Sequence, residues 1–325
     1  MNVENIAYQA YCTAIALRLK HFEELRKQIR MRNKRSLILV LPVFLGVICM
    51  FTLKGSILTG ALVVCTLIVL GLVTFFFVLP NPADTIEEDF KNEIIRGMFK
   101  SLDPTWKYNS MDGITAKSFL DSDLYHQDKL SKLEEFDHVF GNYHGSPFSI
   151  ALIKASESVT RGYGVNRLRN SEILTSNFFG LCYFIWSSKA FNSTLLLFSD
   201  RWAGAADELD ENERKNELEI AKNPKFTRCK SGTELFSPVF RCYSTEPPLA
   251  NTFLDERMCA ARLDLRTRFP GCLSVSFIGH HVCIHLCGEK DFLPFSLNKP
   301  MDQSLLDAYL QEFLVKFLVV RNFMG

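Results

Sequence analysis

The chain has 325 residues, of which 47% are hydrophobic and 22% are charged, and its formal net charge is +1. Domains that bind nucleic acid usually carry a broad basic excess, so this balance argues against nucleic acid as the main partner. The 10 cysteines are scattered without a C-x-x-C pair, which favours reduced, mostly buried thiols over a disulfide framework.

Residues 1–35 are predicted to form a basic amphipathic arm that lies in the cytoplasm. Its apolar face is marked by residues at helical spacing, namely Ile15, Leu19, Phe22, Leu25 and Ile29. Basic side chains are concentrated at its end. They could bind anionic lipid headgroups, and the residues concerned are Arg26, Lys27, Arg30, Arg32, Lys34 and Arg35. The same cluster could bind nucleic acid, but the pattern favours a simple topology determinant at a membrane surface.

Two uncharged apolar runs follow, at residues 36–53 and 57–79, joined by Lys54-Gly55-Ser56. At ~1.5 Å rise per residue, each run is about as long as the ~30 Å hydrocarbon core of a bilayer. The runs predict a two-helix transmembrane hairpin over residues 36–79. Because the preceding flank carries far more Lys and Arg than the joint, both termini are expected in the cytoplasm.

Residues 80–325 are predicted to form one cytoplasmic domain of the α+β class. Its first helix, over residues 84–100, is expected to pack on the basic arm. Thr115 is expected to cap a short helix that runs through Phe119 and Leu120. Alternating or apolar runs predict strands at residues 148–157, 178–186, 194–198 and 239–244.

The last third of this domain contains two further predicted helices and a hairpin. The helices cover residues 248–268 and 302–321, the latter with Leu306, Leu310, Phe313 and Phe317 on one face. Residues 273–278 and 282–286 predict a hairpin turning at Gly279-His280. The charged segment near residues 203–223 reads as a solvated helix or as an insertion that mixes order and disorder.

The best chemical candidate is a strand that alternates histidine and cysteine with aliphatic residues. Because strand side chains alternate, one face carries His281, Cys283, His285 and Cys287. Imidazole and thiolate suit zinc, but four ligands in a row along one strand span ~20 Å and cannot converge on one ion. The pattern therefore favours a strand with one core face and one partly exposed face over a metal site, and no cofactor is predicted.

The glycine-containing loop over residues 161–167 could hold a phosphate through Arg161, Arg167 and its backbone amides. It has neither the dinucleotide fingerprint nor a Walker lysine, which favours a solvated turn. The sequence also has no nucleophile-elbow or zincin motif, so no catalytic residue is predicted.

Several blocks of the chain, in order over roughly residues 80–323, are similar to those of a known family. They comprise residues 90–125, 148–151, 179–181, 232–246 and 273–286, then Asp291-Phe292 and Pro294-Phe295. In these blocks the chain resembles a bacterial membrane-protein family catalogued as domain of unknown function 3137. The resemblance implies a membrane-anchored cytoplasmic domain, with the bacterial inner membrane as its location. No activity and no catalytic residue come with it.

The leading functional hypothesis is a non-enzymatic module, tethered to the bilayer, that binds an unknown protein partner or a second copy of itself. The alternative is an enzyme or a small-ligand-binding domain whose site is assembled from residues distant in the sequence. A third hypothesis is lipid-headgroup sensing by residues 20–35. A deep pocket with convergent polar groups would favour the second hypothesis, whereas a flat apolar patch would favour the first.

Overall fold

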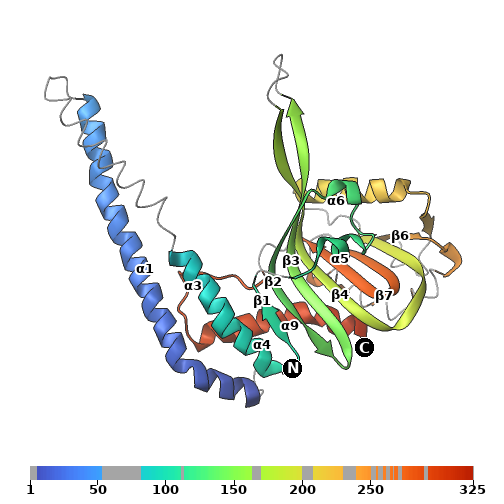
Figure 1. Cartoon of the computed structure of the whole chain (residues 1–325), viewed down its shortest axis with the longest axis horizontal. Helices are drawn as coiled ribbons and strands as arrows, with labels where there is room; N and C mark the ends of the chain where they lie inside the picture. Colours follow the sequence, from blue (N-terminus) through green and yellow to red (C-terminus); the bar gives the residue numbers. More distant parts are fainter. Residues whose placement is uncertain are drawn as a thin grey trace. The chain divides into compact units, whose positions relative to one another are not determined.

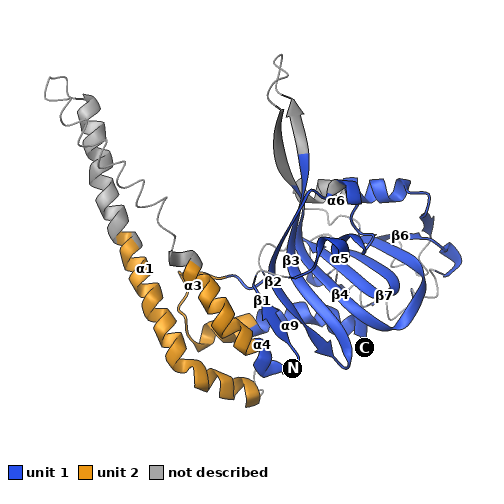
Figure 2. Cartoon of the chain, in the orientation of Figure 1, with its two compact units in different colours: residues 1, 99–294, 310–325 blue, residues 2–98, 295–309 orange. Residues whose placement is uncertain are grey.

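The computed structural model of the protein describes two compact units (Figure 2). Unit 1 comprises residues 1, 99–294 and 310–325, and unit 2 comprises residues 2–98 and 295–309. The residues that the structure describes are 6–52, 82–110, 113–162, 170–199, 208–229, 239–249, 254, 259–260, 264–265, 267–269, 273–288 and 292–324.

Unit 2 is built on a long N-terminal helix, α1, which runs over Ile6–Thr52. The positions predicted to form its apolar face are buried at Ile15, Leu19, Phe22 and Ile29. A second helical segment packs on this face, and it comprises α3 (Pro82–Phe90), the π-helical turn η1 (Lys91–Ile95) and the start of α4 (Arg96–Leu102). The rings of Phe22 and Phe90 meet edge to face at 5.5 Å, so the predicted packing of the two segments is confirmed.

The predicted two-helix transmembrane hairpin is wrong. Within the described residues, no helix has the length and apolar character needed to cross a bilayer. The first apolar run is the end of α1, a helix 47 residues long whose earlier part is rich in charge, and it does not form a helix of its own. The second run lies outside the described residues. The predicted fold class, the multi-pass topology and the integral-membrane location with cytoplasmic termini are overturned with the hairpin.

Unit 1 is built on an antiparallel sheet, which in the described part of the chain has seven strands (Figure 1). The order is β1-β2-β3-β4-β6-β5, and β7 pairs with β4. The strands are β1 (Lys107–Asn109), β2 (Lys132–Tyr143), β3 (Ser146–Gly162), β4 (Asn170–Ser199), β5 (Thr227–Cys229), β6 (Phe240–Ser244) and β7 (Leu273–Cys287). All predicted strand segments fall on strands, two of them within the single strand β4.

The predicted hairpin at Gly279-His280 is also wrong, because β7 continues through it as one strand. Both halves of β7 pair with the same strand, β4, from Ser274↔Phe198 to Cys287↔Gly180. Gly279 has a positive φ of 56° and sits where the register shifts. Glycine adopts a positive φ easily, and here that conformation accompanies an irregularity within the strand instead of a tight turn.

Helices cover both faces of the sheet in unit 1. On one face, Phe119 of α5 (Ala116–Leu120) packs in a cluster with Ala151 and Ile153 of β3. On the other, Phe317 of α9 (Gln303–Met324) meets Phe148 of β3 at 5.2 Å between ring centroids. Successive residues of β3 therefore face different helices, as strand geometry requires.

The predictions for the helices of this unit have different outcomes. Thr115 caps α5, with its Oγ1 accepting from the Ser118 amide at 3.2 Å, as predicted. The charged segment forms a helix, α6 (Glu208–Lys222). The predicted helix over residues 302–321 is α9, and its four marked apolar side chains are buried. Most of the predicted helix over residues 248–268 lies outside the described residues.

Candidate functional site

A pocket of about 410 Å³ lies between the α5 segment and the sheet. Segments that are far apart in the sequence build it: the α5 segment, and strands β3, β4 and β7. Its lining residues are Gly113, Ile114, Thr115, Ser118, Asp121, Ser149, Phe184, Ile278, His281 and Cys283. Apolar and polar side chains thus converge on one cavity, which has the size and mixed lining of a small-molecule site.

The α5 segment contributes hydroxyl groups and a carboxylate to the pocket. Thr115 and Ser118 share a hydrogen bond of 3.0 Å between their hydroxyl oxygens. Asp121 follows the last residue of α5, and its backbone N–H donates to the Lys117 carbonyl. Phe119, fully buried under the segment, holds it on the sheet through stacking on His285 at 4.9 Å. The polar groups of the segment are therefore fixed by a short capped helix with an aromatic anchor.

Strand β3 contributes Ser149, whose orientation is set by a neighbouring irregularity in β2. Ser149 Oγ and His138 Nε2 are 2.7 Å apart and share a hydrogen bond. His138 lies where the β2–β3 register shifts, next to Asp137 with a φ of +46°. The hydroxyl of Tyr108 donates to the Asp137 carboxylate and so supports this conformation. Bulges re-aim side chains, and this one directs His138 at Ser149.

Gly113 allows the loop before α5 to pass close to this histidine. A Cβ atom at Gly113 would lie 3.1 Å from Cγ of His138 and 3.0 Å from a carboxylate oxygen of Glu135. Such contacts are tighter than ordinary van der Waals packing. A glycine at this position therefore lets the pocket rim lie close to His138 without displacing the His138–Ser149 pair.

Strand β7 contributes His281 and Cys283, both of which are predisposed to be neutral. Burial and the neighbouring His280 lower the pKa of His281. Burial raises the pKa of Cys283 to about 12. At neutral pH the pocket therefore presents an imidazole, a thiol and hydroxyl groups without charge, beside the carboxyl group of Asp121.

The structure divides the predicted histidine and cysteine residues between the pocket and the core. His281 and Cys283 line the pocket, whereas His285 and Cys287 are 2% and 3% exposed and pack under α5. Both faces of β7 are thus covered at its end, and the predicted partly exposed face is not found there. Among the described residues, no three side chains of His, Cys, Asp or Glu come together as a metal site would need.

His285 has a consequence for acid stability. Complete burial lowers the pKa of His285 to about 3. Below the ordinary histidine pKa of about 6.5, this residue therefore binds a proton in the unfolded chain but stays neutral in the folded chain. As the pH falls from 6.5 to 5, the free energy of unfolding should therefore decrease by up to about 1.4 kcal/mol per pH unit because of His285. Urea titrations followed by tryptophan fluorescence at three pH values would measure the slope.

His285→Phe should remove that part of the slope while keeping the ring that stacks on Phe119. His21→Gln, at an exposed position of α1, is the matched control and should keep the slope of the wild type. Parallel pH profiles for the wild type and His285→Phe would contradict the prediction.

The predicted headgroup residues lie on α1, where Arg26 is buried within unit 2. Its guanidinium donates to Glu23 at 2.7 and 2.6 Å and to the Leu297 carbonyl at 2.9 Å. The hydrogen bonds from Arg26, together with one from the Met301 amide, lower the pKa of Glu23 to about 2. Lys27 makes an ion pair with the same carboxylate at 3.6 Å. Arg26 thus makes contacts within unit 2, and a headgroup role stays a prediction for the remaining five residues, Lys27, Arg30, Arg32, Lys34 and Arg35.

The predicted phosphate loop lies largely outside the described residues, and its phosphate role stays a prediction. Arg161 and Gly162 are the last residues of β3, and the rest of the loop lies outside the described residues. By contrast, sequence reasoning missed Ser149, His138 and Asp121 as site residues. Thr115 carried a local signal, its helix-capping position, and that signal concerned structure and not binding.

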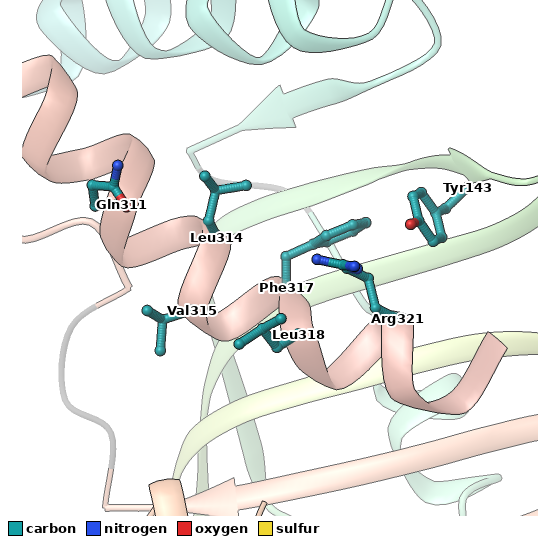
Figure 3. Close-up of a pocket in the computed structure, with 7 residues that line it drawn as sticks. All are labelled: Tyr143, Gln311, Leu314, Val315, Phe317, Leu318 and Arg321. Carbon is teal, nitrogen blue, oxygen red and sulfur yellow. The ribbon is translucent and has the colours of Figure 1, made fainter. Parts of the chain in front are cut away.

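A second, smaller pocket of about 230 Å³ lies on α9 (Figure 3). Its lining is mostly aliphatic and aromatic, with Arg321 beside the rings of Phe317 and Tyr143. Those two rings meet edge to face at 5.1 Å. Fewer hydrogen-bonding side chains line this pocket than line the one under α5, which is therefore the stronger candidate.

Comparison with known proteins finds similarity to a family but no activity. Residues 176–324 match the family model described as "Protein of unknown function (DUF3137)". No curated protein matches the chain. The crystal structure of the mycobacterial trehalose monomycolate transport factor A, TtfA, is similar at 9% identity and a TM-score of 0.32, over 68% of this chain and 89% of that chain. Over residues 176–324, the match supports the resemblance noted in the sequence, without its membrane or bacterial part.

Proposed function

We propose that unit 1 binds a small organic molecule in the pocket under α5. The observation that carries this proposal is the convergence of polar side chains from three distant segments, beside Phe184 of a fourth, on one cavity of about 410 Å³. Cavities of about 300–1,000 Å³ with an apolar lining and a few placed polar groups are typical of small-ligand sites. This was the alternative hypothesis from the sequence, whereas the tethered interaction module relied on the hairpin that the structure overturns.

The chemistry of the lining favours a ligand with an apolar body and a neutral or cationic polar end. Ile114, Phe184 and Ile278 supply apolar surface, and hydroxyls supply hydrogen-bond donors and acceptors. With His281 and Cys283 neutral, the carboxyl group of Asp121 dominates the local charge. An amine would be attracted to it, and a carboxylate of the same shape would be repelled.

The test uses the full-length chain and two fragments that share a phenyl group, benzylamine and phenylacetate. Ligand-observed NMR at neutral pH should detect benzylamine binding and much weaker or no binding of phenylacetate. Asp121→Asn should weaken benzylamine binding by about tenfold, equivalent to about 1.4 kcal/mol.

A variant that fills the cavity separates pocket binding from surface binding. Ser118→Phe should abolish the benzylamine signal because the new ring occupies the pocket. Lys117→Phe adds the same ring at an exposed neighbouring position that does not line the pocket, and it should bind like the wild type. Equal binding of both fragments, unchanged in Ser118→Phe, would refute the proposal.

A further inference from the structure

Two cysteines face each other at the edge of the sheet, away from the residues that line the pocket. Cys229 on β5 and Cys242 on β6 are register partners in an antiparallel pair. Directly opposite residues of antiparallel strands have Cα atoms about 4.5–5.5 Å apart. That separation lies within the range of about 4.4–6.8 Å that a disulfide bridges. Neither residue is disulfide-bonded in the structure, so the pair is a dithiol with the backbone spacing of a disulfide.

The two thiols differ in a way that suits thiol–disulfide exchange. Cys242 is 2% exposed, on a strand that is flanked by β4 and β5. Cys229 is half-buried on β5, which ends the strand order, so that a small reagent can reach it. A hydrogen bond from the Cys242 thiol lowers the pKa of Cys229, which raises its thiolate fraction. Cys229 thus has the properties of an attacking thiol and Cys242 those of a resolving thiol.

We infer that Cys229 and Cys242 form a reversible disulfide by exchange with a small-molecule disulfide such as oxidised glutathione. The Cys229 thiolate attacks one glutathione sulfur, which breaks the glutathione S–S bond and releases one glutathione thiolate. The Cys242 thiol gives up its proton and its sulfur then attacks Cys229 Sγ, which releases the second glutathione. The protein loses two protons and two electrons, and one oxidised glutathione becomes two reduced glutathiones.

The other described cysteines do not share this combination of exposure and partner position. Cys12, Cys182, Cys259, Cys283 and Cys287 are all buried. Burial also raises the pKa of Cys283, so its thiolate is scarce at neutral pH. Oxidation is therefore expected to be selective for the β5–β6 pair among the described cysteines.

The experiment equilibrates the full-length reduced chain in glutathione buffers from fully reduced to fully oxidised, then blocks free thiols and maps peptides by mass spectrometry. The expected result is a cross-linked peptide joining Cys229 to Cys242, about 2 Da lighter than the two reduced peptides. Returning the sample to reduced glutathione should restore both thiols. Absence of this cross-link at the most oxidising ratio, or preferential linkage of Cys229 to another cysteine, would overturn the inference.

Variants test the order of the two steps. Cys242→Ser should trap glutathione on Cys229, because no thiol remains to resolve the mixed disulfide. Cys259→Ser is the matched control at a buried cysteine outside the pair, and it should behave like the wild type. An unmodified Cys229 in Cys242→Ser would contradict the mechanism.

A labelling measurement on the wild type does not depend on any variant folding. Under native reducing conditions, iodoacetamide should alkylate Cys229 at least about tenfold faster than Cys259. Equal rates at the two cysteines would count against the inference.

Discussion

Gly180→Ala is expected to lower the free energy of unfolding by about 3 kcal/mol or more, since it forces overpacking against backbone atoms. Gly180 of β4 pairs with Cys287 at the end of β7. A Cβ atom there would lie 2.0 Å from the Leu286 carbonyl oxygen and 2.9 Å from the Cys287 Cα. Neither atom belongs to a side chain that can rotate away, so β4 and β7 would have to separate.

Urea denaturation of the full-length chain, followed by tryptophan fluorescence, would measure this loss. Gly145→Ala is a graded control, because φ is +82° there but a new Cβ meets nothing within 4 Å. Its cost should be limited to backbone strain, about 1 kcal/mol. Equal stability of the two alanine variants would show that the close approach of β7 is not what constrains Gly180.

Arg241→Met is expected to cost about 3 kcal/mol, because it leaves a buried carboxylate without its cationic partner. Arg241 of β6 donates to both carboxylate oxygens of Glu217 on α6, at 2.5 and 2.6 Å. The Glu217 side chain is 6% exposed, and it also accepts from the Tyr243 hydroxyl at 3.2 Å. The pair joins α6 to the sheet, and its loss should appear both in urea denaturation and in the helical circular dichroism signal.

Adding Glu217→Gln to Arg241→Met should recover part of the lost stability. The amide carries no charge to desolvate, and its oxygen still accepts from Tyr243. The coupling between the two positions then follows from a double-mutant cycle with Glu217→Gln alone. If the double variant is less stable than Arg241→Met, the loss of stability in Arg241→Met does not come from the unpaired buried charge of Glu217.

Elements set by local periodicity could be predicted from the sequence. Leu306, Leu310, Phe313 and Phe317 mark the buried face of α9 because their spacing is that of one helix, whatever it packs against. Thr115 could be recognised as a cap because capping involves only residues a few positions apart.

Features that depend on a partner strand could not be predicted. Gly279-His280 has the composition of a turn, but the register shifts between Trp186 and Leu195 of β4 let β7 continue past it. The transmembrane prediction failed for a related reason, since residues 36–52 were judged without the helix that they extend.

The candidate site could not be predicted from the sequence either, because it also depends on which strands pair. Ser149 and Cys283 line the same pocket only because β3 and β7 both pair with β4, where Phe184 is the register partner of both residues. His138 meets Ser149 through an irregularity in β2 that has no signature in the sequence. Two of the candidate metal residues, His281 and Cys283, do line the site, although strand alternation alone gave no indication of a pocket there.

The length of β4 has a consequence for how the protein is made. This 30-residue strand pairs with β3 made before it, and with β6 and β7 made after it. At Leu197, one neighbour is Cys242 and the other is Val275, so the ribosome must finish most of the chain before both edges are satisfied. Until then, β4 exposes an unpaired edge that invites association between nascent chains. Folding of the sheet is therefore expected to be largely post-translational, and truncations before Leu273 should aggregate.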